Sequence, residues 1–194
     1  MGSLRITATR SRIEDVGADS DVRVSLGATT IYAPSEAILQ TEIEMIADAI
    51  YRSAAGYLSM TRNVLGKLSR EKAGIDRIER RLFGAVLGRQ LRLGRLESIV
   101  CSSIRGKLFR VFVNSENVEK FRASLATARE ILWDKSVLQV QTLEKEIFGR
   151  RSYNTWSSSS HLLARLVYMG VAEQIDKYSV RLTPGLRDAL RSSS

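Results

Sequence analysis

The spacing of apolar residues predicts a long amphipathic helix in the first third of the chain. Apolar and polar residues first alternate over residues 22–26, which is typical of a short strand. Ser35 then stands where a helix N-cap is favoured, directly after a proline. From there to Met60 the apolar residues recur at helical spacing, so the pattern predicts one helix over residues 35–62.

Two shorter helices and a β-hairpin are predicted to follow. The first helix runs from Val64 to about Ala73, and the second, which is amphipathic and strongly basic, continues from Ile75 to Leu87. The period then changes to that of strands over residues 96–101 and 108–113, with a turn between them. Three helices followed by a hairpin therefore make up the first part of the chain.

The same order of elements is predicted again in the C-terminal half. A helix over 119–133 is followed by a short strand over 137–140 and by a helix that is capped by Thr142 and stops at Gly149. A helix from Trp156 to Met169 comes next, then strands at 171–175 and 179–182, and a final helix over 184–190. The duplication is one of element order, without a sequence repeat. We expect a mostly α-helical α+β protein with small β-hairpins, divided into a mobile arm (1–21), an N-terminal basic unit (22–115) and a C-terminal unit (116–194).

One segment of the C-terminal half carries a resemblance to a known superfamily. The run from Leu162 to Val171 is a helix that ends in an apolar residue and Gly170, and a hairpin through Tyr178 then closes on Leu182-Thr183. This arrangement resembles the recognition helix and wing of winged helix-turn-helix proteins. The resemblance covers residues 138–190, whereas for residues 36–113 it rests on element order alone. It implies two winged-helix-type units in tandem, the first with an unusually long N-terminal helix.

The resemblance also implies how such a protein would contact DNA. The N-terminal end of the helix from Trp156 would face the major groove, where base edges carry sequence information. The groove-facing candidates in this sequence are Ser157, Ser158, Ser159, Ser160, His161 and Arg165. The candidates for phosphate contact in the C-terminal unit are Lys145, Arg150 and Arg151, with Lys177 and Arg181 on the wing. In the N-terminal unit they are Lys67, Arg70, Lys72, Arg77, Arg80, Arg81 and Arg89, with Arg105 and Lys107 at the wing tip.

The distribution of charge supports a polyanionic partner. The formal net charge is +9 at pH 7, and the isoelectric point is near 10.0. Residues 62–110 contain thirteen Lys or Arg against four Asp or Glu, while the rest of the chain contains seventeen of each. The basic excess is thus confined to the predicted helices and hairpin of the first unit.

Several other classes of protein are disfavoured. A single Cys101 and a single His161 supply neither an intramolecular disulfide nor a metal site. The sequence has no phosphate-binding glycine loop, no nucleophile elbow and no compact acidic cluster, so we expect neither an enzyme nor a cofactor. No apolar stretch approaches the length of a membrane span. A cytoplasmic, nucleoid-associated protein is expected.

The sequence predicts a double-stranded DNA-binding protein that acts in transcription regulation, chromosome or plasmid maintenance, or replication initiation. The alternative is a winged-helix scaffold for protein partners in a nucleoprotein or condensin-like complex. Binding of RNA or single strands is less favoured, because aromatic residues are not interleaved with the basic ones. A homodimer is expected through the long first helix, with Ile46 and Ile50 at its interface.

Overall fold

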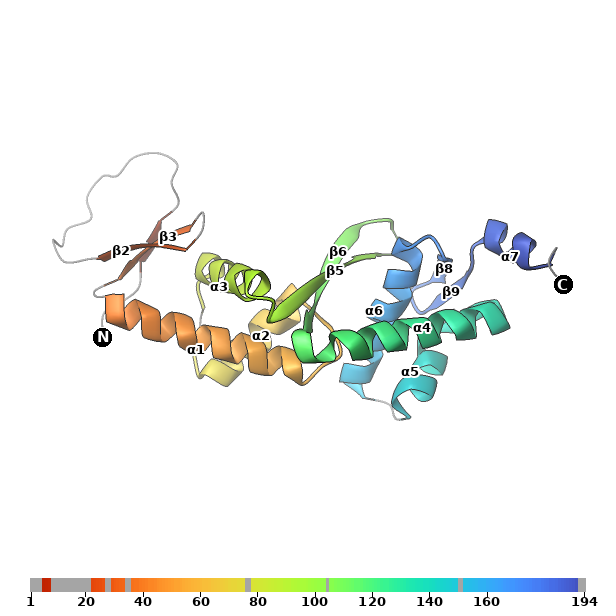
Figure 1. The fold of residues 1–194 in the computed structure, drawn as a ribbon, viewed down its shortest axis with the longest axis horizontal. Coiled ribbons are helices and arrows are strands. Elements are labelled where there is room, and N and C mark those ends of the chain that lie inside the picture. The colour runs from red at the N-terminus through yellow and green to blue at the C-terminus, as the bar shows by residue number, and fades with distance from the viewer. Residues whose placement is uncertain are drawn as a thin grey trace. The chain divides into compact units, whose positions relative to one another are not determined.

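The computed structural model describes residues 5–7, 22–26, 29–33, 36–75, 78–103, 105–149 and 152–191. Helices predominate in this mixed α/β chain, and three small antiparallel sheets of three strands accompany them (Figure 1). The chain divides into two compact units. Unit 1 comprises residues 1–53 and 63–95, and unit 2 comprises residues 54–62 and 96–194.

Unit 1 combines a sheet with three helices. The strands β1 (Arg5–Thr7), β2 (Val22–Leu26) and β3 (Thr29–Ala33) form a sheet in the order β1-β3-β2. The helices are α1 (Glu36–Ala55), α2 (Arg62–Ala73) and α3 (Arg80–Arg92), and α3 lies against β2 and β3. The strand expected at 22–26 is thereby confirmed.

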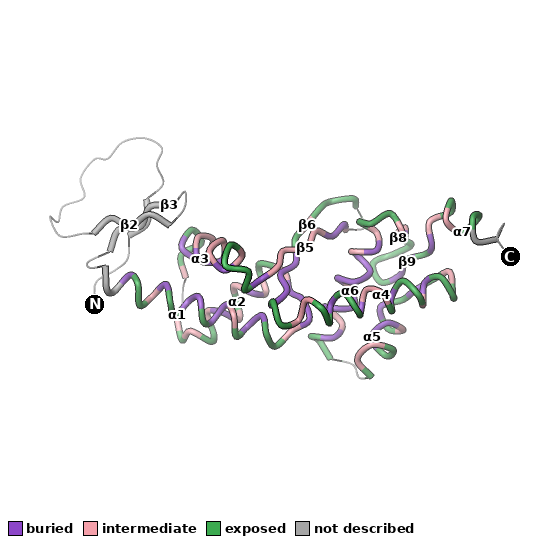
Figure 2. The backbone as a smooth tube through the Cα atoms, in the orientation of Figure 1, coloured by how far each residue is buried: buried purple, intermediate pink, exposed green. Residues whose placement is uncertain are grey.

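The helices of unit 1 bury their apolar faces. Ile46 and Ile50 of α1, Leu65 of α2 and Val86 of α3 are all inaccessible to solvent. Figure 2 shows buried stretches along each of these three helices. Burial of such side chains is the main stabilising term for a unit of this size. Since Ile46 and Ile50 are already buried within one chain, the homodimer interface predicted for these two residues is wrong.

Two helix boundaries in unit 1 differ from the predicted ones. The helix expected over 35–62 ends at Ala55, because the chain turns and enters strand β4 (Met60–Thr61) instead. The helix expected from Ile75 begins at Arg80, where the carboxylate of Glu79 accepts hydrogen bonds from the first-turn amides. The proposed N-cap Ser35 lies outside the described residues.

Unit 2 contains two sheets and most of the remaining helices. The first sheet, β4-β6-β5, is formed by β4, β5 (Leu96–Ser102) and β6 (Leu108–Asn114), and the short 3-10 helix η1 (Ser115–Asn117) follows. The second sheet, β7-β9-β8, is formed by β7 (Val137–Gln139), β8 (Ala172–Asp176) and β9 (Ser179–Leu182). The helices are α4 (Val118–Lys135), α5 (Val140–Phe148), α6 (Tyr153–Tyr168) and α7 (Pro184–Arg191).

These elements match the predicted order of the C-terminal half, with two local differences. Helix α5 begins at Val140 with Gln139 as its N-cap, so the N-cap predicted at Thr142 is wrong. Helix α6 starts earlier than expected, because Ser152 and Thr155 form a capping box at its first turn.

The main core of unit 2 lies between α4, α5, α6 and the second sheet. Phe121, Leu132, Leu138, Leu143 and Leu162 are fully buried in it. A smaller cluster joins the β5–β6 hairpin to α6 and contains Cys101, Val111 and Ala164, with Ile99 and Phe109 packed against it. Because the hairpin packs on α6, the division between the units falls at 95/96 instead of the expected 115/116.

Candidate nucleic-acid interface

Helix α3 presents arginines on the side away from its buried face. Leu82, Phe83, Val86, Leu87 and Gln90 are buried. At 3.6 residues per turn, Arg81 and Arg92 lie three turns apart on the opposite side, and both are exposed. Arg80 and Arg95 are exposed as well, and Arg89 is half-buried.

These arginines are not neutralised by ion pairs in the part of the chain that the structure describes. Arg80, Arg81, Arg89, Arg92 and Arg95 all lack a salt-bridge partner there. The nearest carboxylate in sequence, Glu79, is engaged in capping α3. An exposed, uncompensated guanidinium is well suited to a phosphate, because its planar fork can donate two parallel hydrogen bonds.

The basic residues of α2 are less available. Lys67 lies 3.9 Å from the carboxylate of Glu71, and Lys72 donates a 2.9 Å hydrogen bond to the carbonyl of Arg52. Arg70 is half-buried. The main positive surface of unit 1 is therefore what we call the arginine face of α3. It comprises Arg81 and Arg92 opposite the buried side of the helix, Arg80 and Arg89 on its two flanks, and Arg95 just after the helix end.

In unit 2, the turn between β5 and β6 carries exposed charge. Arg105 and Lys107 are exposed on either side of Gly106, which has a φ of 69°. Glycine adopts a positive φ without strain, so Gly106 allows a tight turn. A turn was predicted at this position between the two strands.

The serine run of α6 does not face outward as predicted. Ser158, Ser159 and His161 are buried, so the prediction that they reach a DNA groove is wrong. Ser157 and Ser160 are half-buried, and Ser160 donates a 2.9 Å hydrogen bond to the carbonyl of Trp156 within the helix. The cause is tertiary, since the β5–β6 hairpin packs against α6.

Arg165 is also engaged by this contact. Its Nη1 donates a 2.8 Å hydrogen bond to the carbonyl of Val100 in β5, and its guanidinium lies 4.9 Å from the ring centroid of Tyr168. Nearby, burial lowers the pKa of His161 to about 4, although its interaction with Ser59 acts in the opposite direction. His161 is thus neutral at pH 7 and contributes no charge toward a phosphate.

The turn between β8 and β9 carries a lysine that forms no ion pair among the described residues. Lys177 is exposed in the turn between β8 and β9, 5.0 Å from the ring centroid of Tyr178. Arg181 pairs with Glu173 on the neighbouring strand, which offsets its charge. Lys145 is exposed on α5. The remaining predicted contacts, Arg77, Arg150 and Arg151, lie outside the described residues.

Comparison of the chain with protein-family models, with curated proteins and with solved structures gives no match. No helix among the described residues is both long enough and apolar enough to cross a membrane. The function must therefore be inferred from the geometry and charge of the residues themselves.

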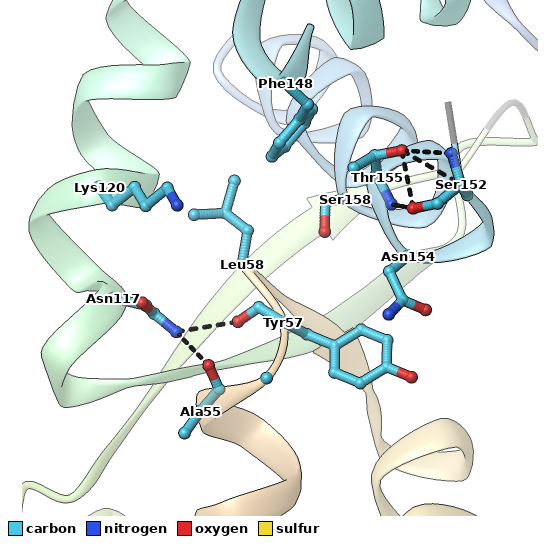
Figure 3. Close-up of a pocket in the computed structure, with 11 residues that line it drawn as sticks. Ala55, Tyr57, Leu58, Asn117, Lys120, Phe148, Ser152, Asn154, Thr155 and Ser158 are labelled. Atoms are coloured by element: carbon cyan, nitrogen blue, oxygen red, sulfur yellow. Dashed lines mark hydrogen bonds between the residues drawn. The ribbon is translucent and has the colours of Figure 1, made fainter. Parts of the chain in front are cut away.

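Two groups of residues were not singled out from the sequence. Arg92 and Arg95 fall inside the basic region 62–110, and that excess is the signal that could have identified them. The second group lines a pocket of about 170 Å³ in unit 2, to which residues 55–58, the start of α4, the end of α5 and the first turns of α6 contribute (Figure 3). Its residues are far apart in sequence, so no local pattern marks them.

Proposed function

We propose that this chain binds double-stranded DNA through two winged-helix-type units, with the arginine face of α3 as the principal contact to phosphates. The observation that carries the proposal is the set of arginines on α3 and the turn after it, which have no ion-pair partner among the described residues. Exposed cations of this kind release counterions when they meet a duplex, and that release supplies most of the affinity of non-specific binding.

The order of elements supports the proposal. The series α1-β4-α2-α3-β5-β6 and the series α4-β7-α5-α6-β8-β9 follow the same plan. In both sheets the last strand lies between the other two, as β4-β6-β5 and β7-β9-β8. In winged helices the third helix enters the major groove, and by this correspondence those helices are α3 and α6.

The two third helices are not equally suited to DNA. The arginine face of α3 is exposed or half-exposed along its length, whereas α6 is covered on one side by the β5–β6 hairpin. We therefore propose phosphate contacts by α3 in unit 1 and, separately, by Arg105 and Lys107 in the β5–β6 turn of unit 2. Such contacts position a protein on a duplex without reading its sequence, and a role in chromosome or plasmid maintenance, replication initiation or transcription regulation is compatible with them.

The experiment that tests this proposal is a salt titration of binding to mixed-sequence duplex DNA, single-stranded DNA and double-stranded RNA of equal length. We expect tight binding to duplex DNA and a steep fall in affinity as salt rises. No duplex binding at about 50 mM salt, where non-specific contacts are strong, contradicts the proposal.

A second candidate function is a scaffold for protein partners, and the covered face of α6 favours it. Arg165 and His161 of α6 contact Val100, Cys101 and Phe109 of the hairpin, so in unit 2 the helix that would read DNA is used for packing. Absence of duplex binding together with a stable complex with a protein partner would support this function instead.

A further inference from the structure

The pocket in unit 2 is lined by hydrogen-bond donors and one cation. Lys120 on α4 points into the space beside Leu58, and Asn154 and Ser158 face it from α6 (Figure 3). No lining residue is a carboxylate. Lys120 is exposed and takes part in no ion pair within the described ranges, so its charge is available to a ligand.

A hydrogen-bonded segment forms one wall of the pocket. The side-chain amide of Asn117 donates to the carbonyls of Ala55 and Tyr57, at 3.1 and 3.0 Å. These two bonds hold residues 55–57 against the start of α4. The wall is therefore ordered before any ligand arrives, which reduces the entropic cost of binding.

The first turn of α6 opens onto the same pocket. This helix of 16 residues has no acidic residue in its first turn. The capping box uses the amides of Ser152 and Thr155, which leaves the amides of Tyr153 and Asn154 without an intrahelical acceptor. Free amides and the positive end of the helix dipole favour an anion at this position.

Ser158 provides a second and independent indication of a ligand. The residue is only 2% exposed, and its hydroxyl forms no hydrogen bond with any described residue. In Figure 3 the hydroxyl points into the pocket. A hydroxyl that no protein group accepts from is available to a ligand, so a polar group in the pocket that accepts its hydrogen bond would stabilise the bound state.

A buried glutamate contacts the first turn of α6. Glu144 is buried on α5, and its Oε1 accepts hydrogen bonds from the amide of Ser152 and the hydroxyl of Thr155. It does not line the pocket. Because this carboxyl group already accepts hydrogen bonds at this end of α6, the attraction of an anion depends mainly on Lys120.

We propose that this pocket binds a phosphate group, with Lys120 as its counter-charge and with Ser158, Asn154 and the free amides of α6 as hydrogen-bond donors. A tetrahedral oxyanion accepts several hydrogen bonds at once, which matches a set of donors that converge from two helices. The phosphate can belong to a small phosphorylated molecule or to the backbone of DNA. The DNA source rests on the proposed function, whereas the small-molecule source is independent of it.

The test uses the full chain and inorganic phosphate as the probe, with amide chemical shifts measured by NMR. The variants are Lys120→Ala, Ser158→Ala and the control Lys135→Ala, which removes an exposed lysine from the same helix outside the pocket. We expect saturable shifts at Tyr153 and Asn154 in the wild type and the control. Affinity should fall about tenfold or more in each pocket variant.

The Ser158→Ala variant separates binding from folding. It removes a hydroxyl that has no partner in the protein, so its unfolding midpoint should equal or exceed that of the wild type while its phosphate affinity falls. Absence of saturable shifts, or equal affinity in both pocket variants and the wild type, would overturn the proposal.

A second arm identifies the source of the phosphate. If phosphate belongs to DNA, a duplex shifts the same amides and inorganic phosphate competes with it. If it belongs to a small molecule, a mononucleotide 5′-phosphate binds while a duplex leaves these amides unchanged. Both patterns support the pocket, and failure of duplex binding alone would count only against the proposed function.

Discussion

The Nδ1 atom of His161 lies 3.0 Å from the hydroxyl of Ser59, although 102 positions separate the two residues. Both residues are buried, and the imidazole also lies 6.2 Å, between ring centroids, from Phe109 on the β5–β6 hairpin. This contact connects the segment before β4, the hairpin and α6. The protonation of His161 is therefore coupled to the stability of unit 2.

Unit 2 should lose stability as the pH falls from 6.5 toward 4. Burial lowers the pKa of His161 from 6.5 to about 4, so between these values the unfolded chain binds a proton that the folded chain does not. The free energy of unfolding therefore rises with pH in this window. The contribution of neutral, buried His161 is about 3 kcal/mol and is fully present above pH 6.5. Urea unfolding at a series of pH values measures the effect.

The control is His161→Asn, which keeps a polar group near Ser59 but does not titrate. The pH dependence contributed by His161 should vanish in this variant, while that of the carboxylates remains. His161 is the only histidine of the chain, so its imidazole resonance can be followed by NMR without ambiguity. Titration of the folded protein near pH 6.5 would contradict the prediction.

The thiol of Cys101 should be unreactive in the folded protein. Burial raises its pKa to about 12, and the guanidinium of Arg165 offsets only part of this effect. Because the thiolate is the reactive species, a thiol reagent at pH 8 should modify native protein very slowly and label one equivalent after denaturation. Rapid labelling of the native state would show that the hairpin opens from α6.

Two glycines should respond oppositely to substitution by alanine. At Gly66 in α2, an added Cβ would lie 3.6 Å from the ring of Phe83, an ordinary contact distance. Gly66→Ala should therefore stabilise unit 1 by up to about 1 kcal/mol through helix propensity. Gly149 ends α5 with a φ of 63°, so Gly149→Ala should destabilise unit 2 by about 1 kcal/mol. Urea unfolding of each variant measures the change in the free energy of unfolding of the unit concerned. A change of the same sign in both variants would contradict the prediction.

Removal of two arginines from the arginine face should change the salt dependence of duplex binding. In the double variant Arg80→Ala and Arg81→Ala, two phosphate contacts are lost, and the slope of log K against log salt should become less negative by about 2. The control, Arg129→Ala with Lys135→Ala, removes the same charge from exposed positions on α4 and should leave the slope nearly unchanged. Equal effects of the two pairs would exclude a specific role for α3.

Much of the fold follows from local patterns in the sequence. The high content of β-forming residues in 96–101 and 108–113 predicted β5 and β6, and Gly149 and Gly170 marked the ends of α5 and α6. These signals work because they depend on the backbone conformation of a few neighbouring residues. The end of α1 could not be found in this way, since Met60 leaves the helical pattern to pair with Phe112 in β6.

The candidate site shows the same limit. The excess of arginine over residues 62–110 identified the charged region, because net charge needs no tertiary information. The serines of α6 were misassigned, since burial of Ser159 and His161 depends on a hairpin that is distant in sequence. The pocket around Lys120 was missed for the same reason, as its walls come from four separate segments.

The discontinuous make-up of unit 2 has a consequence for synthesis of the chain on the ribosome. Residues 63–95 are inserted between the two pieces of unit 2, and the hairpin β5–β6 is translated well before α6. Until α6 emerges, the hairpin face with Cys101, Val111 and Phe109 lacks the helix that covers it in the folded chain. The nascent chain therefore carries an apolar strand surface for a period set by the rate of elongation, and such a surface is prone to aggregation until α6 covers it.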